Sequence, residues 1–250
     1  MNLSGAKVLV TGGGRGIGRR LVEGFLADGA LVGVFERDDD LCAELRAAFD
    51  GRVLAWPCDV SDPDAVDAAV ASAKQDGFEP DVLVNNAGVI HSEPLVNFTA
   101  RGDRVHSRRA WRDVMAADLD SVFYVTSRVV DGMMARRCKG VVISISSIAA
   151  AGNPGQSAYS AAKAAVNALT ATWAKELGPL GFRFAAIAPG FFDTPSTHAA
   201  LSDTIITRLK QQIPLRRLGN PEAIYLAARQ IVENDYLTGT VLELDGGLTL

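Results

Sequence analysis

Short apolar runs alternate with longer amphipathic patterns along the chain. The runs are typical of strands buried on both faces, and the longer patterns, in which apolar residues recur every three or four positions, are typical of helices. This alternation predicts an α/β protein with one parallel sheet of seven strands and helices on both faces. The predicted strands cover residues 6–10, 31–35, 52–56, 81–84, 141–145, 182–187 and 241–244, and the predicted helices cover residues 21–28, 41–49, 63–73, 111–136, 164–177, 197–212 and 221–232. No repeat, low-complexity tract or linker interrupts this order, so we expect a single domain spanning residues 1–250.

A glycine-rich turn follows the first predicted strand. Residues 11–18 read Thr-Gly-Gly-Gly-Arg-Gly-Ile-Gly, and a predicted helix comes next. Glycines let the backbone approach a pyrophosphate, and the first N–H groups of a helix bind its negative charge. Many glycine-rich turns are only tight turns, but strand, turn and helix in this order predict a dinucleotide-binding site.

An acidic residue, Glu36, ends the second predicted strand. Its place after the glycine-rich turn suits a carboxylate that bonds the adenosine ribose hydroxyls and repels the 2′-phosphate of NADP. Arg37 follows directly and Arg15 lies within the turn, and either guanidinium would favour NADP instead. The sequence therefore favours NAD and leaves NADP as the alternative.

Tyr159 and Lys163 stand four residues apart, next to a predicted helix. Side chains at positions i and i+4 share one edge of a helix, so we expect the phenol and the ammonium to be neighbours. A nearby cation stabilises phenolate and lowers the pKa of a tyrosine from about 10, which prepares it for proton transfer near neutral pH. The same spacing also occurs by accident on exposed helices, so the rest of the chain must decide between these interpretations.

Two further stretches are candidates for substrate contact. Ser146 and Ser147 follow the fifth predicted strand, and ligands of open parallel sheets bind beyond the carboxyl ends of the strands. Residues 91–110 are the least regular part of the chain and contain four arginines. These arginines belong either to a solvated loop or to a basic rim that selects an anionic substrate.

Composition narrows the class of protein. A net charge of −4 argues against a nucleic-acid-binding surface. No N-terminal signal segment and no apolar run long enough for a bilayer is apparent, so we expect a cytoplasmic protein without membrane contact. The three cysteines and three histidines are scattered without metal-ligand spacing, which indicates reduced thiols and no metal site.

Six motifs in one order resemble those of the short-chain dehydrogenase/reductase family. The nearest resemblance is to its 3-oxoacyl-carrier-protein reductase-like branch, which includes many polyol, sugar and alcohol dehydrogenases. The resemblance covers nearly the whole chain and implies a Rossmann-type doubly wound fold, a nicotinamide cofactor and a homotetramer or homodimer. The motifs are Thr11-Gly12-x-x-x-Gly16-x-Gly18, Asp59, Asn85-Asn86-Ala87-Gly88, Ser147, Tyr159-x-x-x-Lys163 and Pro189-Gly190 through Thr194.

The resemblance also implies a role for each matching residue. Tyr159 is expected to be the general acid/base, and Lys163 is expected to bond the nicotinamide ribose and lower the pKa of Tyr159. The implied cofactor contacts are Gly12, Arg15, Gly16, Ile17 and Gly18 at the pyrophosphate, Glu36 at the adenosine ribose, Asp59 and Val60 at the adenine, Asn86 with Gly88 near the adjacent ribose, and Ile187, Pro189, Gly190, Phe192 and Thr194 at the nicotinamide half.

The family's catalytic serine can be matched to this chain in two ways. Alignment of the strand end points to Ser147, whereas counting back thirteen residues from Tyr159 points to Ser146. A one-residue deletion between Ile148 and Gly152 reconciles the two counts and favours Ser147.

The chain departs from the family pattern at two other places. Asp118 stands where the family usually has an asparagine that helps to hold a water in the proton relay from the lysine. An ionised carboxylate accepts hydrogen bonds but cannot donate them, and its charge is expected to oppose the effect of Lys163. The span from Gly88 to Trp111 is several residues longer than usual and is expected near the substrate entrance.

The expected function is reversible hydride transfer between NAD(H) and a secondary alcohol or ketone. Ser147 is expected to bond the substrate oxygen while Tyr159 moves the proton. Two alternatives stay open: an NADPH-dependent 3-oxoacyl thioester reductase, and a nicotinamide-binding protein without turnover, which Asp118 supports. The sequence does not identify the substrate.

Overall fold

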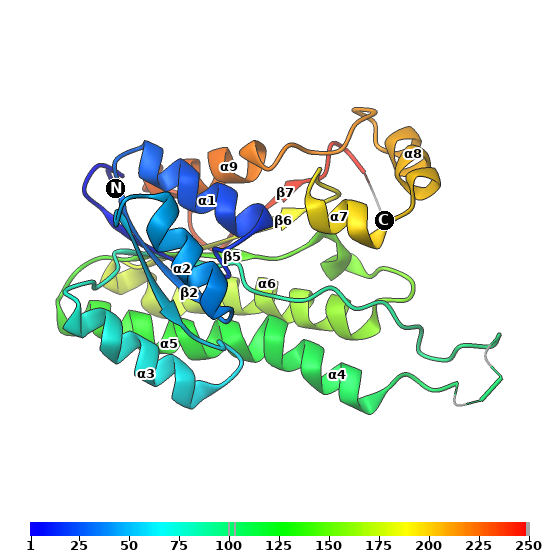
Figure 1. The fold of residues 1–250 in the computed structure, drawn as a ribbon, viewed down its shortest axis with the longest axis horizontal. Coiled ribbons are helices and arrows are strands. Elements are labelled where there is room, and N and C mark those ends of the chain that lie inside the picture. Colours follow the sequence, from blue (N-terminus) through cyan, green and yellow to red (C-terminus); the bar gives the residue numbers. More distant parts are fainter. Residues whose placement is uncertain (100, 103, 249–250) are drawn as a thin grey trace.

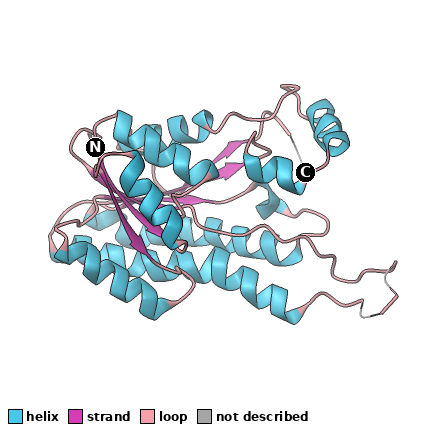
Figure 2. Ribbon diagram, viewed as in Figure 1, coloured by secondary structure: helices cyan, strands magenta, loops and turns pink. Residues whose placement is uncertain are grey.

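A parallel sheet of seven strands forms the centre of the molecule (Figures 1 and 2). The structure, a computed structural model, describes residues 1–99, 101–102 and 104–248. The strand order β3-β2-β1-β4-β5-β6-β7 reverses its direction of growth between β1 and β4, as in doubly wound folds, and the predicted fold class is confirmed. The strands are β1 (Lys7–Thr11), β2 (Leu31–Glu36), β3 (Val53–Pro57), β4 (Val82–Asn85), β5 (Val141–Ile145), β6 (Arg183–Pro189) and β7 (Thr240–Leu244).

Helices cover both faces of this sheet (Figure 1). Helices α1, α2 and α9 pack on one face, and α3, α5 and α6 pack on the other. The helices are α1 (Gly16–Ala27), α2 (Asp39–Ala48), α3 (Pro63–Gln75), α4 (Arg108–Met115), α5 (Ser121–Ala135), α6 (Ser157–Leu177), α7 (Pro195–Ala200), α8 (Asp203–Gln212) and α9 (Glu222–Glu233), and short 3₁₀ turns cover Ile148–Ala151 and Gly178–Leu180.

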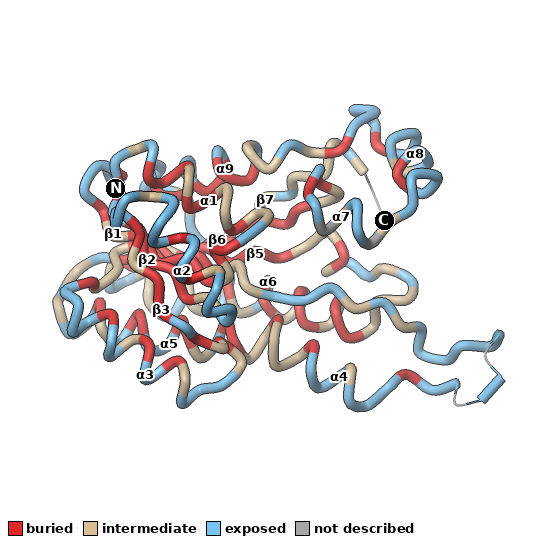
Figure 3. Tube along the Cα trace, in the orientation of Figure 1, coloured by how far each residue is buried: buried red, intermediate tan, exposed pale blue. Residues whose placement is uncertain are grey.

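The first strand shows why the strands read as continuous apolar runs. Successive residues of a strand face opposite sides of the sheet. Val8 and Val10 therefore belong to the core under α1 and α9, whereas Leu9 belongs to the core under α3 and α5. Burial on both faces extends from β1 to β6, whereas the edge strand β7 has no buried residue and the described residues of the loop that leads to α4 are largely exposed (Figure 3).

The predicted helix over residues 111–136 contains an irregularity that its apolar pattern does not reveal. The helical path begins earlier, at Arg108, because the Ser107 hydroxyl accepts a hydrogen bond from the N–H of Ala110. A π-helical turn (Ala116–Asp120) then separates α4 from α5. Such turns are often found at functional sites, and this one carries Asp118.

The prediction of one helix over residues 197–212 is wrong, because the structure has two. Helix α7 starts earlier, at Pro195, and ends at Ala200, and Leu201 adopts an extended backbone conformation. The Ser202 hydroxyl then accepts a hydrogen bond from Ile205 N–H and starts α8. A serine at this place begins a new helix instead of continuing the old one.

The carboxyl ends of β1, β2, β4, β5 and β6 lie along one edge of the sheet, because these strands are parallel. The residues proposed for cofactor and substrate follow these ends, so the fold brings them to a common side. Among the described residues, no helix has both the length and the apolar character needed for a membrane span.

Candidate active site

The turn after β1 depends on glycine at several positions. Gly12 and Gly16 have φ angles of +64° and +56°, which side-chain-bearing residues rarely adopt. A Cβ atom on Gly18 would overlap the carbonyl oxygen of Gly12, so only glycine allows this close approach of helix and turn. Asn86 braces the turn from β4, since its Nδ2 donates to the carbonyls of Thr11 (2.9 Å) and Gly12 (3.0 Å).

The start of α1 offers free N–H groups to an anion. Helices α2, α3 and α4 each begin with a side chain whose oxygen accepts from the first turn, namely Asp38, Asp62 and Ser107. Helix α1 begins after Arg15, which makes no such bond, and its first turn contains no acidic residue. Its N–H groups and the positive end of its dipole are therefore available to a pyrophosphate. The residues present fit the phosphates of a dinucleotide.

Glu36 lies beside the glycine-rich turn, at the carboxyl end of β2. Its Oε2 accepts from Gly14 N–H (3.0 Å), and its Oε1 accepts from Arg37 N–H (3.0 Å). These bonds fix the carboxylate next to the turn, where the ribose of a dinucleotide would lie. Both Arg15 and Arg37 are exposed.

The residues predicted to contact the adenine, Asp59 and Val60, lie just beyond β3, after Cys58. Val60 is buried and presents an apolar surface. Burial acts to raise the pKa of Asp59, but hydrogen bonds from the Ser61 hydroxyl and N–H outweigh it and lower this pKa. Asp59 is therefore an ionised hydrogen-bond acceptor at neutral pH.

Tyr159 and Lys163 lie on the first turns of α6, and both are buried, with exposed fractions of 9% and 4%. The Lys163 ammonium lies 5.6 Å from the centre of the Tyr159 ring. It also donates to the Ile145 carbonyl at the end of β5 (3.0 Å). The alternative of an exposed pair on a helix surface is therefore excluded.

Asp118 was expected to act on Lys163, and the structure shows that the two side chains form a direct ion pair. Asp118 Oδ1 lies 3.0 Å from Lys163 Nζ, Asp118 Oδ2 accepts from Val89 N–H (3.2 Å), and the Asp118 side chain is fully buried. A Cβ on Gly88 would overlap Asp118 Oδ1, so glycine at position 88 makes room for this pair.

Burial and charge act in opposite directions on this ion pair. Burial raises the pKa of Asp118, and the attraction of Lys163 offsets only part of that rise. Burial acts to lower the pKa of Lys163, but the Asp118 carboxylate outweighs it and raises this pKa. Lys163 is consequently kept charged at neutral pH, with its charge partly balanced by Asp118.

The two serines after β5 differ in their hydrogen bonds. Ser146 is 2% exposed, and its hydroxyl donates to the Lys163 carbonyl (3.3 Å). The Ser147 hydroxyl accepts from Ala149 N–H (3.1 Å), and its own proton has no acceptor among the described residues. Ser147 can therefore donate to a ligand without losing a bond within the protein.

The segment after β6 carries the residues predicted to contact the nicotinamide half of the cofactor. Gly190 N–H donates to the Leu244 carbonyl, and Thr194 caps α7. Phe192 belongs to the buried core together with Ile187, so its side chain packs inside the protein. Pro189 ends β6 and places this segment at the carboxyl edge of the sheet.

A hollow of about 520 Å³ lies beside the start of α6. Arg108 and Arg112 give it a basic character, and no ion pair joins either guanidinium to a carboxylate of the described residues; His106 lines it beside them. Ser157, two positions before Tyr159, also lines it. The remaining lining residues are Leu95, Val105 and Trp111.

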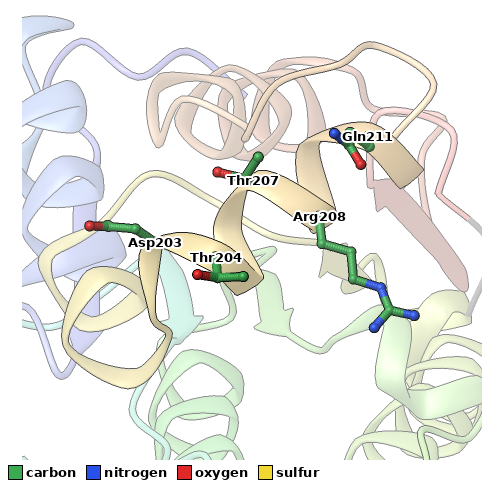
Figure 4. A pocket seen from close by; sticks show the side chains of 5 residues that line it. All are labelled: Asp203, Thr204, Thr207, Arg208 and Gln211. Atoms are coloured by element: carbon green, nitrogen blue, oxygen red, sulfur yellow. The ribbon is translucent and has the colours of Figure 1, made fainter.

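A second hollow, on α8, lacks the features of an active site (Figure 4). All of its lining residues come from that one helix: Asp203, Thr204, Thr207, Arg208 and Gln211. No second element lines it, whereas Ser157 of the helix that carries Tyr159 lines the first hollow.

Fold and site together define a class of protein. A glycine-rich turn at an uncapped helix start, beside a buried tyrosine–lysine pair, is the arrangement of a nicotinamide-dependent oxidoreductase. A family model described as "Enoyl-(Acyl carrier protein) reductase" matches residues 12–249, and the chain belongs to the short-chain dehydrogenase/reductase family.

Curated and solved relatives agree with this assignment. The chain is 35% identical to a 3-oxoacyl-acyl-carrier-protein reductase of Thermotoga maritima over 100% of both chains. It is 34% identical to a gluconate 5-dehydrogenase of Gluconobacter oxydans, over 100% of this chain and 96% of that protein. A solved putative gluconate dehydrogenase of Agrobacterium tumefaciens is similar with a TM-score of 0.88 and 26% identity, covering 99% of this chain and 97% of that one. The protein is thus an oxidoreductase that uses a nicotinamide cofactor and acts on CH–OH or ketone groups.

Proposed function

We propose that the protein catalyses reversible, NAD-dependent oxidation of a secondary alcohol that carries an anionic group. The observation that carries this proposal is the buried pair of Tyr159 and Lys163 at the carboxyl edge of the sheet. A phenol held beside a charged ammonium, away from bulk water, is suited to exchange a proton with a substrate oxygen.

In this mechanism, Ser147 donates a hydrogen bond to the substrate oxygen, and Tyr159 accepts the alcohol proton during oxidation and returns it during reduction. Lys163 stabilises the phenolate through its charge, and Ile145 and Asp118 hold Lys163 in place. A bound nicotinamide would accept or supply the hydride. Residues that would hold it are Gly12, Arg15, Gly16, Ile17, Gly18, Glu36, Asp59, Val60, Asn86, Gly88, Lys163, Pro189, Gly190, Phe192 and Thr194.

The charges around Glu36 support NAD over NADP. The Glu36 carboxylate is fixed beside the glycine-rich turn, and three further aspartates follow at positions 38–40. This concentration of negative charge would repel a 2′-phosphate. Exposed Arg15 and Arg37 are the residues that would oppose this preference.

The basic hollow supports an anionic substrate. Arg108 and Arg112 have no carboxylate partner among the described residues, and the hollow adjoins the helix that carries Tyr159. A sugar acid fits this charge, and one of the similar proteins is named as a gluconate 5-dehydrogenase. The second candidate is reduction of a 3-oxoacyl thioester, which the similarity to 3-oxoacyl-acyl-carrier-protein reductases favours.

We also propose that the enzyme is a cytoplasmic homotetramer or homodimer. Phe123 and Met134 on α5 and Leu226 on α9 are exposed apolar side chains, and β7 is an edge strand. Apolar side chains on long helices and an open strand edge are suited to contact a second copy. The cysteines of the described chain are unpaired, as is usual in reducing compartments.

The test is a panel of sugar acids, neutral polyols and 3-oxoacyl thioesters, each measured with NAD(H) and NADP(H) through the absorbance of the reduced nicotinamide. We expect the highest kcat/KM for a sugar acid with NAD. A preference for a thioester with NADPH would establish the second candidate. Tight cofactor binding without turnover of any alcohol or ketone would instead indicate a nicotinamide-binding protein without catalytic activity.

A further inference from the structure

Three potential metal ligands gather in the long loop between β4 and α4. His91, Glu93 and His106 each offer one ligand atom, and these atoms all lie within 4.8 Å of one another. The two histidines are fifteen positions apart in sequence. The expectation of scattered histidines is therefore wrong for His91 and His106, because the loop folds back and brings its two ends together.

The distances within this cluster fit the edges of a coordination tetrahedron. Zn²⁺ bonds to imidazole nitrogen and carboxylate oxygen at about 2.0–2.2 Å, so neighbouring ligand atoms in a tetrahedral site lie roughly 3.3–3.6 Å apart. Glu93 Oε2 lies 3.0 Å from His91 Nε2 and 3.6 Å from His106 Nδ1. A shift of a few tenths of an ångström would bring the Glu93–His91 pair to the distance of a metal site, and the 3.6 Å distance shows that one edge of the His106 ring faces Glu93.

The environment of His106 gives a second, independent indication. Its side chain is 7% exposed, yet its Nε2 has no hydrogen-bond partner among the described residues. A buried polar atom without a partner costs free energy. In the present ring orientation, His106 Nδ1 donates to the Ser107 carbonyl (3.0 Å). A half-turn of the ring about the Cβ–Cγ bond leaves its shape almost unchanged, gives up that bond and puts Nε2 in the place of Cε1, on the edge that faces Glu93. A metal there would give Nε2 the partner that it lacks.

We propose that His91, Glu93 and His106 bind a divalent transition metal ion of the Zn²⁺ class. Two neutral imidazoles and one carboxylate form a ligand set that Zn²⁺ accepts, with a fourth position left for water or a substrate oxygen. The side chains of His91 and Glu93 are 36% and 29% exposed, which gives an ion a path to the site.

The ion would hold the loop against the helix that carries Tyr159. The N–H of Glu93 donates to the Gly155 carbonyl (2.6 Å), just before α6. Glu93 Oε1 also accepts from the N–H of Ser107, the residue that caps α4. A metal at Glu93 and both histidines would therefore fasten the two ends of the loop to each other and to the start of α6. His106 lines the basic hollow, so the ion would also shape that hollow.

The test is calorimetric titration of the metal-stripped full-length protein with Zn²⁺, together with Co²⁺ titration followed by visible absorbance. We expect one ion per chain and a Co²⁺ spectrum typical of tetrahedral coordination. His91→Ala and Glu93→Gln are each expected to weaken Zn²⁺ binding at least about tenfold, because each removes one of three ligands. Both side chains are partly exposed and both variants keep His106, so we expect folded proteins, which circular dichroism will check.

His198→Ala is the matched control. His198 Nε2 lies 2.6 Å from Asp193 Oδ1, so this variant also removes a histidine that contacts a carboxylate, but this pair belongs to no three-ligand group among the described residues. We expect Zn²⁺ binding to be unchanged. The proposal would be overturned by the absence of saturable Zn²⁺ binding, or by binding that survives both His91→Ala and Glu93→Gln and therefore belongs to another site, such as Cys138.

Discussion

The cofactor side and the substrate side of the active site are built from different parts of the chain. On the cofactor side, backbone N–H and carbonyl groups define the surface, and glycines allow the close approach of α1 to the turn after β1. On the substrate side, side chains from α4, from the loop before it and from the start of α6 define the hollow. A binding surface made of backbone groups tolerates few substitutions, because most added side chains would block it. A binding surface made of side chains can acquire a preference for another ligand when single residues are substituted. The spacing of the glycines therefore predicts the class of cofactor, whereas no comparable sequence pattern predicts the substrate.

Among substitutions that test this difference between the two sides, the largest effect is expected from Gly18→Ala on the cofactor side. The added Cβ would overlap the Gly12 carbonyl oxygen and push α1 away from the turn. Overpacking of this kind costs about 1–3 kcal/mol, which corresponds to roughly 5- to 150-fold weaker nicotinamide binding. Fluorescence titration with NADH measures the change. Gly132→Ala adds a Cβ to open space on α5 and should leave binding unchanged, so equal effects of the two variants would contradict this account.

The second-largest effect is expected from Glu36→Ala, on the preference for NAD over NADP. Loss of the carboxylate removes charge-assisted hydrogen bonds worth about 1.5–3 kcal/mol, so the preference for NAD over NADP should fall by a factor of about 10 to 100. The ratio of kcat/KM values for the two cofactors measures it. Glu44→Ala, which removes an exposed carboxylate of α2, is the control. An unchanged ratio in Glu36→Ala would show that the carboxylate does not select the cofactor.

A smaller effect is expected on the substrate side, from Arg112→Ala. Removal of a guanidinium from the basic hollow should raise KM for an anionic substrate about tenfold, as expected for a charge-assisted hydrogen bond, and leave kcat nearly unchanged. Steady-state kinetics with a sugar acid and with its neutral polyol counterpart separate charge from shape. Arg109→Ala is the control, because Arg109 is exposed and paired with Asp113. Equal increases for the acid and the polyol would refute a charge-selective hollow.

The smallest effect is expected from Asp118→Asn. Asp118 pairs with Lys163, which is predicted to contact the cofactor and to act on the catalytic Tyr159. Without the carboxylate, the positive charge of Lys163 acts on Tyr159 unopposed and favours phenolate. The same change withdraws the attraction that raises the pKa of Lys163. The limb of the pH profile of alcohol oxidation that reports Lys163 should therefore move to lower pH. The profile of kcat/KM against pH measures the shift, with Asp113→Asn as an exposed control; a profile that stays in place would mean that Asp118 does not oppose Lys163.

The sequence predicted the regular parts of the molecule because each has a local cause. Apolar runs predicted every strand of the sheet, and the i, i+4 spacing placed Tyr159 and Lys163 on one helix. The π-helical turn at Asp118 was not predictable, since its residues keep a helical apolar pattern and its position depends on packing against Gly88 and Lys163. The break between α7 and α8 had a local signal in Ser202, which an apolar pattern alone does not register.

The parts of the site that the sequence missed involve contacts between distant segments. The approach of His91 to His106 depends on how the loop before α4 folds, and no spacing rule describes it. The different hydrogen bonds of Ser146 and Ser147 likewise depend on Lys163 and on the short turn after β5. Such contacts are set by tertiary structure and become visible only when the segments are placed in space.

The central claim is that Tyr159 transfers the proton while the cofactor side works independently of it. The most direct test is Tyr159→Phe, with NADH binding measured by fluorescence and turnover measured on the same preparation. The account predicts nearly unchanged NADH affinity and a fall in kcat of about 10²- to 10⁴-fold, because the general acid/base is lost and the ring is kept. Turnover close to that of the unmodified enzyme would contradict the claim.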